Sequence, residues 1–557
     1  MIPIQEPPKS PITSVAKLGY LSTEKSNQST TNLSQVMHAN TVDGLKILHQ
    51  EDQKVIEGLE QFNKKYYWPV RLLVQQKLLS GGRCFLTGSG SSARVAIDIA
   101  AKSKNPAVIG VMAGGDSIFM RAKEGFEDSE KDGDLALQDY NITKKDLVFL
   151  ISASGSASFN IGCAKYARQK GADVCYFYNS TEIPANTQEL FDKHRVMPLL
   201  IDIGAQTISG STRLQSATLA ELALGSVVLN QEPDSLTPKL QTGNKIIQEH
   251  LQEIAQIVQL EHEVFSDPQA NFRKIKDETS QGYVTFVATE NALRECMIDT
   301  AETAPTFSTN PPRTKNDTHK KKTEFLAFLA GQDDNNAAWR SLLGREINAQ
   351  DMNEVEQFTI SQTALANRPL AKGNLVIGVA KENPESLFPI LSQAKNNGAK
   401  TALIILSQHE ISTKDIPHVD ALLTLPNIES DAAEIVTTVV LKQVLNMISN
   451  GSMILMNKVD GNQMIDVNAS NNKLLDRAAR LVLDIFKRYQ KDDTPDYDSV
   501  FKTIIAVKEL KKECEAKNMY TPSPVKITVT MMKRNLNFEH AVAFLHEHEE
   551  HIEQVFA

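Results

Sequence analysis

Two short stretches rich in serine and glycine are the part of this chain best suited to chemistry. The first follows the apolar residues 84–86 and contains Thr87, Gly88, Ser89, Ser91 and Ser92. The second follows the apolar run 147–151 and contains Ser152, Ser154, Gly155, Ser156 and Ser158. Small residues let the backbone approach a ligand closely, and free amides at a helix start attract an anion. Each stretch suits a phosphate ester, although a serine-rich turn with a good helix cap would give the same pattern.

The flanking residues predict how these two stretches are positioned. Each comes between a short apolar strand and a helical pattern that begins near Ala93 or Phe159. They lie about sixty residues apart, a spacing that suits neighbouring strands of a doubly wound parallel sheet, where ligands collect at the carboxyl edge. We expect the two stretches to form two walls of one pocket. A third small polar turn, with Ser209 and Ser211, precedes another long helical pattern.

Composition excludes several classes of protein. The chain has 557 residues, which predicts two to four domains, and its net charge of −9 argues against a nucleic-acid surface. Five scattered cysteines predict neither a disulfide framework nor a zinc site, and His546, His548 and His551 are expected on a solvated charged face. No apolar run is long enough to span a membrane or to form a signal peptide. We expect a cytoplasmic protein without metal or other cofactor.

The order of predicted strands and helices from Tyr283 repeats that of the first half, with a period of roughly 200 residues. The repeat is unequal, because Lys381, Glu382, Asn383 and Pro384 stand where the first half has the second serine stretch. Four regions are predicted: an extended arm over 1–40, a first α/β domain over 41–235, a second over 236–475 and a helical domain over 476–557. We expect residues 231–243 to form a linker and the residues between 303 and 374 to form a long loop.

Several motifs of the chain match a known family. They are LSTEKSNQST at 21–30, TGSGSSAR at 87–94, AGGD and KEGFEDSE within 113–130, SASGSAS at 152–158, SGSTR at 209–213 and GNQMIDVNASNNKL at 461–474. Through them the chain resembles sugar isomerase (SIS) domain proteins of the N-acetylmuramate 6-phosphate etherase and glucokinase regulatory protein group. The resemblance implies an α/β fold of two tandem SIS domains, each a flavodoxin-like doubly wound parallel sheet, with a helical cap domain at the C-terminus.

The resemblance also implies which residues act. One family glutamate matches Glu124 in KEGFED, and a second matches Glu302 in DTAETAPTFSTNPP of the second half, whereas the first half has Lys102 near the expected carboxylate. A single composite site is therefore implied, with the phosphate held by the first half. Lys473 matches a family lysine near the substrate. From the residues alone, Glu124 could equally be part of an acidic solvated helix end, and Glu302 could simply be exposed.

Three functions follow from the resemblance. The first is a lyase that cleaves N-acetylmuramate 6-phosphate to N-acetylglucosamine 6-phosphate and lactate, which would need two carboxyls with separated pKa values. The second is a non-catalytic sensor that binds a sugar phosphate and controls a partner such as a sugar kinase. The third, an isomerase of amino-sugar phosphates, matches the motifs less specifically. The lyase is our preferred prediction, with no nucleic-acid or membrane partner expected.

Overall fold

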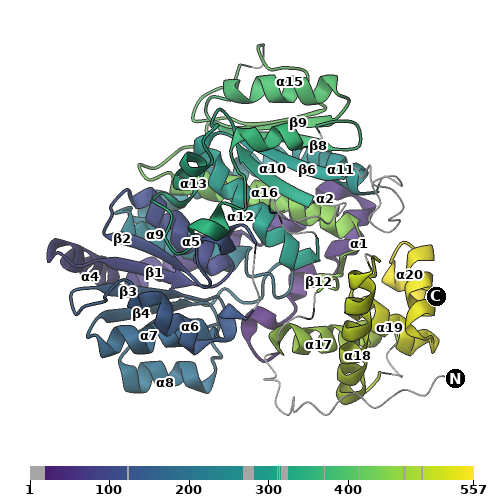
Figure 1. Cartoon of the computed structure of the whole chain (residues 1–557), viewed down its shortest axis with the longest axis horizontal. Coiled ribbons are helices and arrows are strands. Elements are labelled where there is room, and N and C mark those ends of the chain that lie inside the picture. The colour runs from purple at the N-terminus through teal and green to yellow at the C-terminus, as the bar shows by residue number, and fades with distance from the viewer. Residues whose placement is uncertain are drawn as a thin grey trace.

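A computed structural model describes residues 19–121, 125–266, 282–309, 312, 314, 324–368, 370–412, 414–467, 469, 472–490, 494–517 and 519–557. Each half of the chain contains one parallel sheet of five strands, and the C-terminal helices, in yellow, lie beside the two halves (Figure 1). None of the helices in these ranges is long and apolar enough to cross a membrane.

The first sheet has the strand order β2-β1-β3-β4-β5, and all four pairings are parallel. Its strands are β1 (Cys84–Gly88), β2 (Val108–Met112), β3 (Leu147–Ile151), β4 (Asp173–Tyr178) and β5 (Met197–Leu200). Every residue of β1 and β3 is buried, as continuous apolar runs in a parallel sheet require. Gly88 pairs with Ile151, so the two serine stretches leave neighbouring strands at the same edge.

Helices cover both faces of this sheet. One face carries α3 (Gln53–Phe62), α4 (Trp68–Leu79), α5 (Ser91–Ser103) and α9 (Gln215–Val228). The other carries α6 (Glu130–Gln138), α7 (Ser158–Gln169) and α8 (Ala185–His194). This arrangement is the doubly wound α/β fold that the sequence predicts.

The second sheet repeats the topology of the first. Its order is β10-β9-β8-β6-β7, which in chain order is the pattern of the first sheet. Its strands are β6 (Tyr283–Ala288), β7 (Glu324–Leu329), β8 (Leu375–Lys381), β9 (Lys400–Leu406) and β10 (Ala421–Leu425). Its helices are α10 (Pro233–Glu249), α11 (Leu251–Ser266), α12 (Glu290–Phe307), α13 (Asn335–Leu343), α14 (Met352–Val355), α15 (Phe388–Asn396) and α16 (Ile435–Leu455). The predicted tandem repeat is confirmed.

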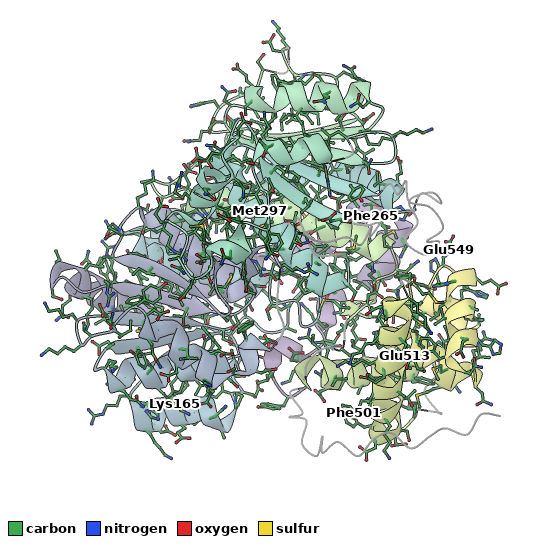
Figure 2. All side chains as sticks on the ribbon, viewed as in Figure 1. Lys165, Phe265, Met297, Phe501, Glu513 and Glu549 are labelled. Atoms are coloured by element: carbon green, nitrogen blue, oxygen red, sulfur yellow. The ribbon has the colours of Figure 1, made fainter. Side chains whose placement is uncertain are left out.

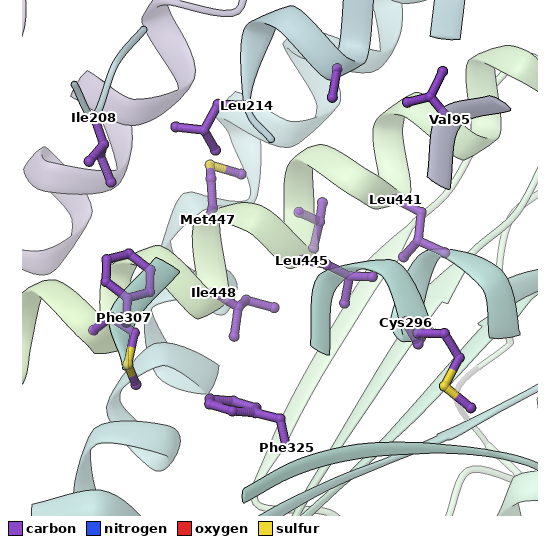
Figure 3. Close-up of a cluster of buried hydrophobic side chains, with 14 of the residues drawn as sticks. Val95, Ile208, Leu214, Cys296, Phe307, Phe325, Leu441, Leu445, Met447 and Ile448 are labelled. Atoms are coloured by element: carbon purple, nitrogen blue, oxygen red, sulfur yellow. The ribbon is translucent and has the colours of Figure 1, made fainter. Parts of the chain in front are cut away.

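The two halves share one hydrophobic core rather than meeting as separate bodies. The helix α16 lies at its centre, between α9 of the first half and α12 of the second (Figure 3). The core contains Leu441, Leu445, Met447 and Ile448 of α16 together with Val95, Leu214, Cys296, Phe307 and Phe325. Burying a side chain of this size stabilises a fold by roughly 1.5–3 kcal/mol, so this shared core fixes the relative position of the halves.

The remaining elements form a helical region at the C-terminus and a cover at the N-terminus. They are β11 (Val459–Asp460), β12 (Gln463–Met464), α17 (Asn472–Tyr489), α18 (Tyr497–Ala516), α19 (Pro524–Arg534), α20 (Phe538–Glu547) and α21 (Ile552–Phe556), with α1 (Leu33–Ala39) and α2 (Thr41–Gln50). Buried residues such as Met297 and Phe265 lie inside the second half, whereas Glu513 lies on α18 and Glu549 in the turn between α20 and α21 (Figure 2). The predicted helical C-terminal region is confirmed.

Three local predictions were wrong. Residues 19–40 are not an extended arm, because Leu21, Leu33 and Met37 are buried and α1 forms within this segment; residues 1–18 lie outside the described residues. Most of the expected linker at 231–243 belongs to the helix α10, which begins at Pro233, where proline is tolerated, and also contains Pro238. The expected long loop after Glu302 contains β7, α13 and α14.

Candidate functional site

The first serine stretch forms a tight turn between β1 and α5. Gly88 is required there, since a Cβ atom at this position would lie 2.9 Å from the backbone nitrogen of Ala93. Gly90 has a positive φ of 54° and immediately precedes the first residue of α5, Ser91. The hydroxyl of Ser89 is buried without a hydrogen-bond partner among the described residues, whereas that of Thr87 lies inside β1 beside the Cys163 thiol of α7. The turn therefore presents one unsatisfied hydroxyl close to a helix N-terminus, an arrangement suited to an anion.

The second serine stretch is ordered by its own hydrogen bonds. Ser152 Oγ accepts from the Gly155 amide at 3.1 Å, and the hydroxyls of Ser154 and Ser156 are 2.7 Å apart. Gly155 has a φ of 70°, and its carbonyl accepts from Thr187 Oγ1 at 2.6 Å. Ser158 is the first residue of α7. The loop is thus preformed at the edge of the sheet that also holds the first turn.

The third polar turn lies against the segment around Asn462. The Ser209 amide donates to the Asn462 carbonyl at 2.9 Å, and the Ser211 hydroxyl is buried without a partner in the described parts of the chain. Gly210 has a φ of 74°, and a Cβ atom there would lie 2.7 Å from the guanidinium carbon of Arg477. Arg477 in turn donates to both carboxylate oxygens of Glu24, at 2.8 and 2.6 Å.

Glu302 reaches from the second half into the first turn of α5. Ser91 Oγ donates to Glu302 Oε2 at 2.5 Å, and the Arg94 guanidinium forms an ion pair with Oε1. Arg94 is 1% exposed and Glu302 6% exposed. Arg94 also donates to the carbonyls of Phe119 and Ile118, at 3.0 and 2.9 Å. The carboxylate of one half is therefore held by a hydroxyl and an arginine of the other.

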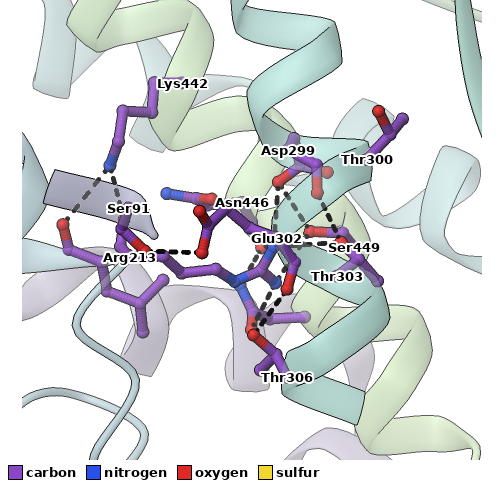
Figure 4. A network of polar contacts seen from close by, with 12 residues as sticks. Ser91, Arg213, Asp299, Thr300, Glu302, Thr303, Thr306, Lys442, Asn446 and Ser449 are labelled. Atoms are coloured by element: carbon purple, nitrogen blue, oxygen red, sulfur yellow. Dashed lines mark hydrogen bonds and ion pairs between the residues drawn. The ribbon is translucent and has the colours of Figure 1, made fainter. Parts of the chain in front are cut away.

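A second arginine, Arg213, joins the halves next to Glu302 (Figure 4). Its guanidinium donates to Asp299 Oδ1 at 3.3 Å, Thr303 Oγ1 at 3.0 Å, Ser449 Oγ at 3.2 Å and Asn450 Oδ1 at 3.0 Å. Burial raises the pKa of Asp299 to about 6, although the positive charge of Arg213 opposes this shift. Asp299 therefore keeps its proton to a higher pH than an exposed aspartate does.

A small cavity with several charged side chains in its lining adjoins this network. Its volume is about 20 Å³, enough for one water molecule but far too small for a sugar. Ser91 and Glu302 form part of its lining, together with Arg213, Asp299 and Lys442. Burial lowers the pKa of Lys442 to about 8, and its ammonium donates to the Arg213 carbonyl at 2.8 Å and to Thr218 Oγ1 at 2.6 Å.

The equivalent region of the second half is filled by buried ion pairs. Arg294 stands at the position of Arg94, and its guanidinium donates to two carbonyls of its own half and to Asp98 of the other, the last at 3.1 Å. Where Glu302 would have its counterpart stands Lys102, which pairs with Asp98. Lys381 occupies the edge of the sheet and pairs with Glu295 at 2.7 Å. Among its described residues this region has no serine turn, and the carboxylate that pairs with Arg294 is Asp98, which Lys102 also neutralises.

The structure brings together some of the predicted residues but not all of them. The two serine stretches leave one sheet edge, and Glu302 contacts the first of them through Ser91. Glu124 lies outside the described residues. Lys473 lies in the first turn of α17, but its side chain is not among those described. In the described ranges no three His, Cys, Asp or Glu side chains are grouped to hold a metal ion.

The sequence reasoning missed four charged residues of this region. They are Glu24, Arg94, Arg213 and Arg477. Three of them lie in motifs that were noted for their small residues: Glu24 in LSTEKSNQST, Arg94 in TGSGSSAR and Arg213 in SGSTR. A charged residue at the end of a small polar motif was the available signal for Arg94 and Arg213, whereas Glu24 lies inside its motif. Its partner, which lies more than 80 residues away in each case, could not be inferred.

Comparisons with known proteins give one family and several relatives. The SIS domain family model matches residues 70–177. N-acetylmuramic acid 6-phosphate etherase of Bacillus subtilis (strain 168) is 32% identical over 216 residues, which are 38% of this chain and 68% of that protein. The protein of the same name from Lactococcus lactis subsp. cremoris (strain SK11) is 33% identical over 216 residues, 38% of this chain and 69% of its own length.

Solved structures are more distant in sequence. Tagatose-6-phosphate ketose/aldose isomerase from Escherichia coli has 12% identity and a TM-score of 0.43, with 78% of this chain and 98% of that chain covered. The C-terminal domain of glucosamine-fructose-6-phosphate aminotransferase from Francisella tularensis has 12% identity and a TM-score of 0.42, with 73% and 95% covered.

Proposed function

We propose that this chain, which belongs to the SIS-domain family of the N-acetylmuramic acid 6-phosphate etherases, binds a phosphorylated amino sugar in one site built by both of its halves. We further propose that it is a lyase, which cleaves the D-lactyl ether of N-acetylmuramate 6-phosphate. The products are N-acetylglucosamine 6-phosphate and D-lactate. One observation carries the proposal: Glu302 of the second half accepts a hydrogen bond from Ser91 at the serine turn of the first.

The roles follow from the chemistry of each group. The hydroxyls of Ser89 and Ser154, with the amides at the starts of α5 and α7, hold the phosphate. Elimination breaks a ring C–H bond and the adjacent ether C–O bond, so a base must take the proton and an acid must protonate the departing lactate oxygen. Water then adds to the new double bond and restores a hydroxyl. Glu124 and Glu302 are the proposed pair, in either order, and Lys473 is the proposed cation over the sugar phosphate.

Two features support a single site in each chain. The serine turns belong to the first half, whereas Lys381 and its ion pair with Glu295 occupy the corresponding edge of the second. In the first half, Lys102 stands at the position that corresponds to Glu302, and its charge is neutralised by Asp98. Among the described residues, the serine turns of the first half and the Glu302 carboxylate of the second therefore form one shared arrangement.

A second candidate function is a sugar-phosphate sensor that regulates a partner such as a sugar kinase. One observation favours it, because Arg94 and Ser91 occupy both oxygens of Glu302 in this structure. With both oxygens held by protein groups, the carboxylate must release one of these contacts before it can take a proton from a bound sugar. A site of this kind could bind the hydroxyls of a sugar without turning it over.

Release of D-lactate from N-acetylmuramate 6-phosphate separates the two functions. We expect lactate from the wild type, with a 10²- to 10⁴-fold lower rate for Glu302→Gln and for Glu124→Gln. Glu290→Gln is the control, because this glutamate begins the same helix and bonds to Ser341 outside the site. No lactate from the wild type, together with thermal stabilisation by the sugar phosphate, would favour the sensor. Unchanged rates in Glu302→Gln would contradict the proposed pair.

A further inference from the structure

The turn that follows β2 in the first half has a conformation that only glycines adopt readily. Gly114 and Gly115 have φ values of 85° and 88°, and they precede the short 3-10 helix η4 (Asp116–Phe119). A Cβ atom on Gly115 would lie 2.4 Å from Asp351 Oδ1, so a residue of the second half approaches the bare backbone of the first. The turn is therefore shaped for a close contact between the halves.

Asp116, at the start of η4, is the centre of that contact. It is 2% exposed, and its carboxylate accepts from Arg345 Nη1 at 2.9 Å and from Nη2 at 2.6 Å. The Asn348 amide donates to the same carboxylate at 3.0 Å. In the reverse direction, the Asp116 amide donates to Asp351 Oδ2 at 3.0 Å. A two-point arginine–carboxylate pair of this kind fixes orientation as well as distance.

The other side of η4 faces the candidate site. The carbonyls of Ile118 and Phe119 accept from Arg94, whose remaining nitrogen pairs with Glu302. A continuous series of contacts therefore runs from Arg345 through Asp116 and η4 to Arg94 and Glu302. Each of its members is a described residue, and both ends belong to the second half.

The segment that contains Arg345 packs directly against the first half. Gly344 has a φ of 68°, and a Cβ atom there would lie 2.3 Å from Cβ of Ala101 in α5. Further along the segment, Glu354 Oε2 accepts from Ser117 Oγ at 2.7 Å. Burial alone would lower the pKa of the Arg345 guanidinium. The hydrogen bonds to Asp116 and its negative charge have the larger effect, so the pKa is raised. The Arg345 guanidinium therefore stays charged at every physiological pH.

We propose that Arg345 is a positioning residue for the site: by holding Asp116 it fixes η4, and η4 fixes the arginine that orients Glu302. The proposal rests on the proposed lyase function, since it assigns a role to Arg345 in that reaction. Arg345 touches no substrate in this role. The position of the Glu302 carboxylate would then depend on how the second half packs against the first.

Arg345→Gln tests the positioning role, and Arg340→Gln is its matched control. Arg340 lies on α13, is 43% exposed and pairs only loosely with Asp334 and Glu346, at 3.7 and 3.8 Å. We expect kcat for lactate release to fall about 10- to 100-fold in Arg345→Gln, because misplacing a reacting group by about 1 Å has an effect of that size. The KM should stay within about threefold, because the serine turns are unchanged. Amide hydrogen exchange of residues 116–120 should be faster.

Two further variants distinguish positioning from general damage. Arg345→Lys should restore only part of kcat, because lysine cannot make the two-point contact. Asp116→Asn should reproduce the loss, and the double variant should be no worse than either single variant. Unchanged kcat and unchanged exchange at 116–120 in Arg345→Gln would overturn the proposal. So would a double variant whose losses simply multiply.

The two proposals can fail separately. If the wild type releases no lactate, the lyase function fails, and the contact is then judged from hydrogen exchange and from stabilisation by N-acetylglucosamine 6-phosphate. Faster exchange at 116–120 in Arg345→Gln with weaker stabilisation by the sugar phosphate supports the positioning of the site. Exchange equal to that of Arg340→Gln refutes it.

Discussion

The buried hydroxyl of Ser89 offers a direct test of phosphate binding. Ser89 Oγ has no hydrogen-bond partner among the described residues, so Ser89→Ala removes no protein hydrogen bond. The stability of the protein without ligand should therefore stay the same or rise slightly, because an unsatisfied buried polar group is lost. If the hydroxyl donates to a phosphate oxygen, the complex loses a hydrogen bond to a charged group, which contributes about 1.5–3 kcal/mol.

That loss predicts a dissociation constant about 10- to 100-fold higher in Ser89→Ala. Isothermal titration calorimetry with N-acetylglucosamine 6-phosphate measures this dissociation constant. Thermal unfolding without ligand checks that the stability of the variant is retained. Ser103→Ala is the control, because this serine ends the same helix and donates to the Ala100 carbonyl at 2.7 Å, away from the turn. Equal affinity in wild type and Ser89→Ala would refute the assignment of this turn to the phosphate.

Two predictions concern buried charges elsewhere. Burial raises the pKa of Glu261 to about 8, so the unfolded chain loses this proton between pH 4.5 and 8 while the folded chain keeps it, and stability falls as pH rises. In denaturant unfolding, the free energy of unfolding of Glu261→Gln should therefore rise by about 3 kcal/mol relative to that of the wild type between pH 4 and pH 7. Glu263→Gln, which changes an exposed side chain of the same helix, is the control. Lys102→Met leaves Asp98 without its nearest cation, so this variant should be about 3–5 kcal/mol less stable than the wild type. Lys193→Met, which removes an exposed lysine, is the control. Equal thermal unfolding of the two variants would contradict the prediction.

Much of the fold could be predicted because local patterns decide it. The apolar runs 84–86 and 147–151 each become a buried strand, and the helices after them begin at Ser91 and Ser158, within two residues of the predicted starts. These strands are buried on both faces, so their sequence carries the signal without help from distant residues.

The missed strands show where local patterns fail. The strand β7 begins with Glu324, whose charge argues against a buried strand until Arg368 is seen to neutralise it at 3.0 Å. The strand β10, which was also not predicted, lies at the edge of its sheet and alternates buried with partly exposed residues, so it lacks the continuous burial of β1 and β3. In both cases the stabilising contact comes from another part of the chain.

The candidate site was predictable in its small residues and not in its charged ones. Glycines and serines are needed for the local shape of a turn, so a motif reveals them. Arg94 acts through Glu302, which lies 208 residues away, and Arg213 acts through Asp299, 86 residues away. Such pairings depend on how the halves meet, which neither half encodes alone.

A crystal structure with N-acetylglucosamine 6-phosphate bound tests the shared site most directly. Our account predicts phosphate oxygens about 3 Å from the hydroxyls of Ser89 and Ser154, with the sugar ring in contact with Glu302 of the second half. A phosphate bound beside Lys381 at the edge of the second sheet would contradict it. So would a sugar that occupies the serine turns but lies beyond the reach of the Glu302 carboxylate.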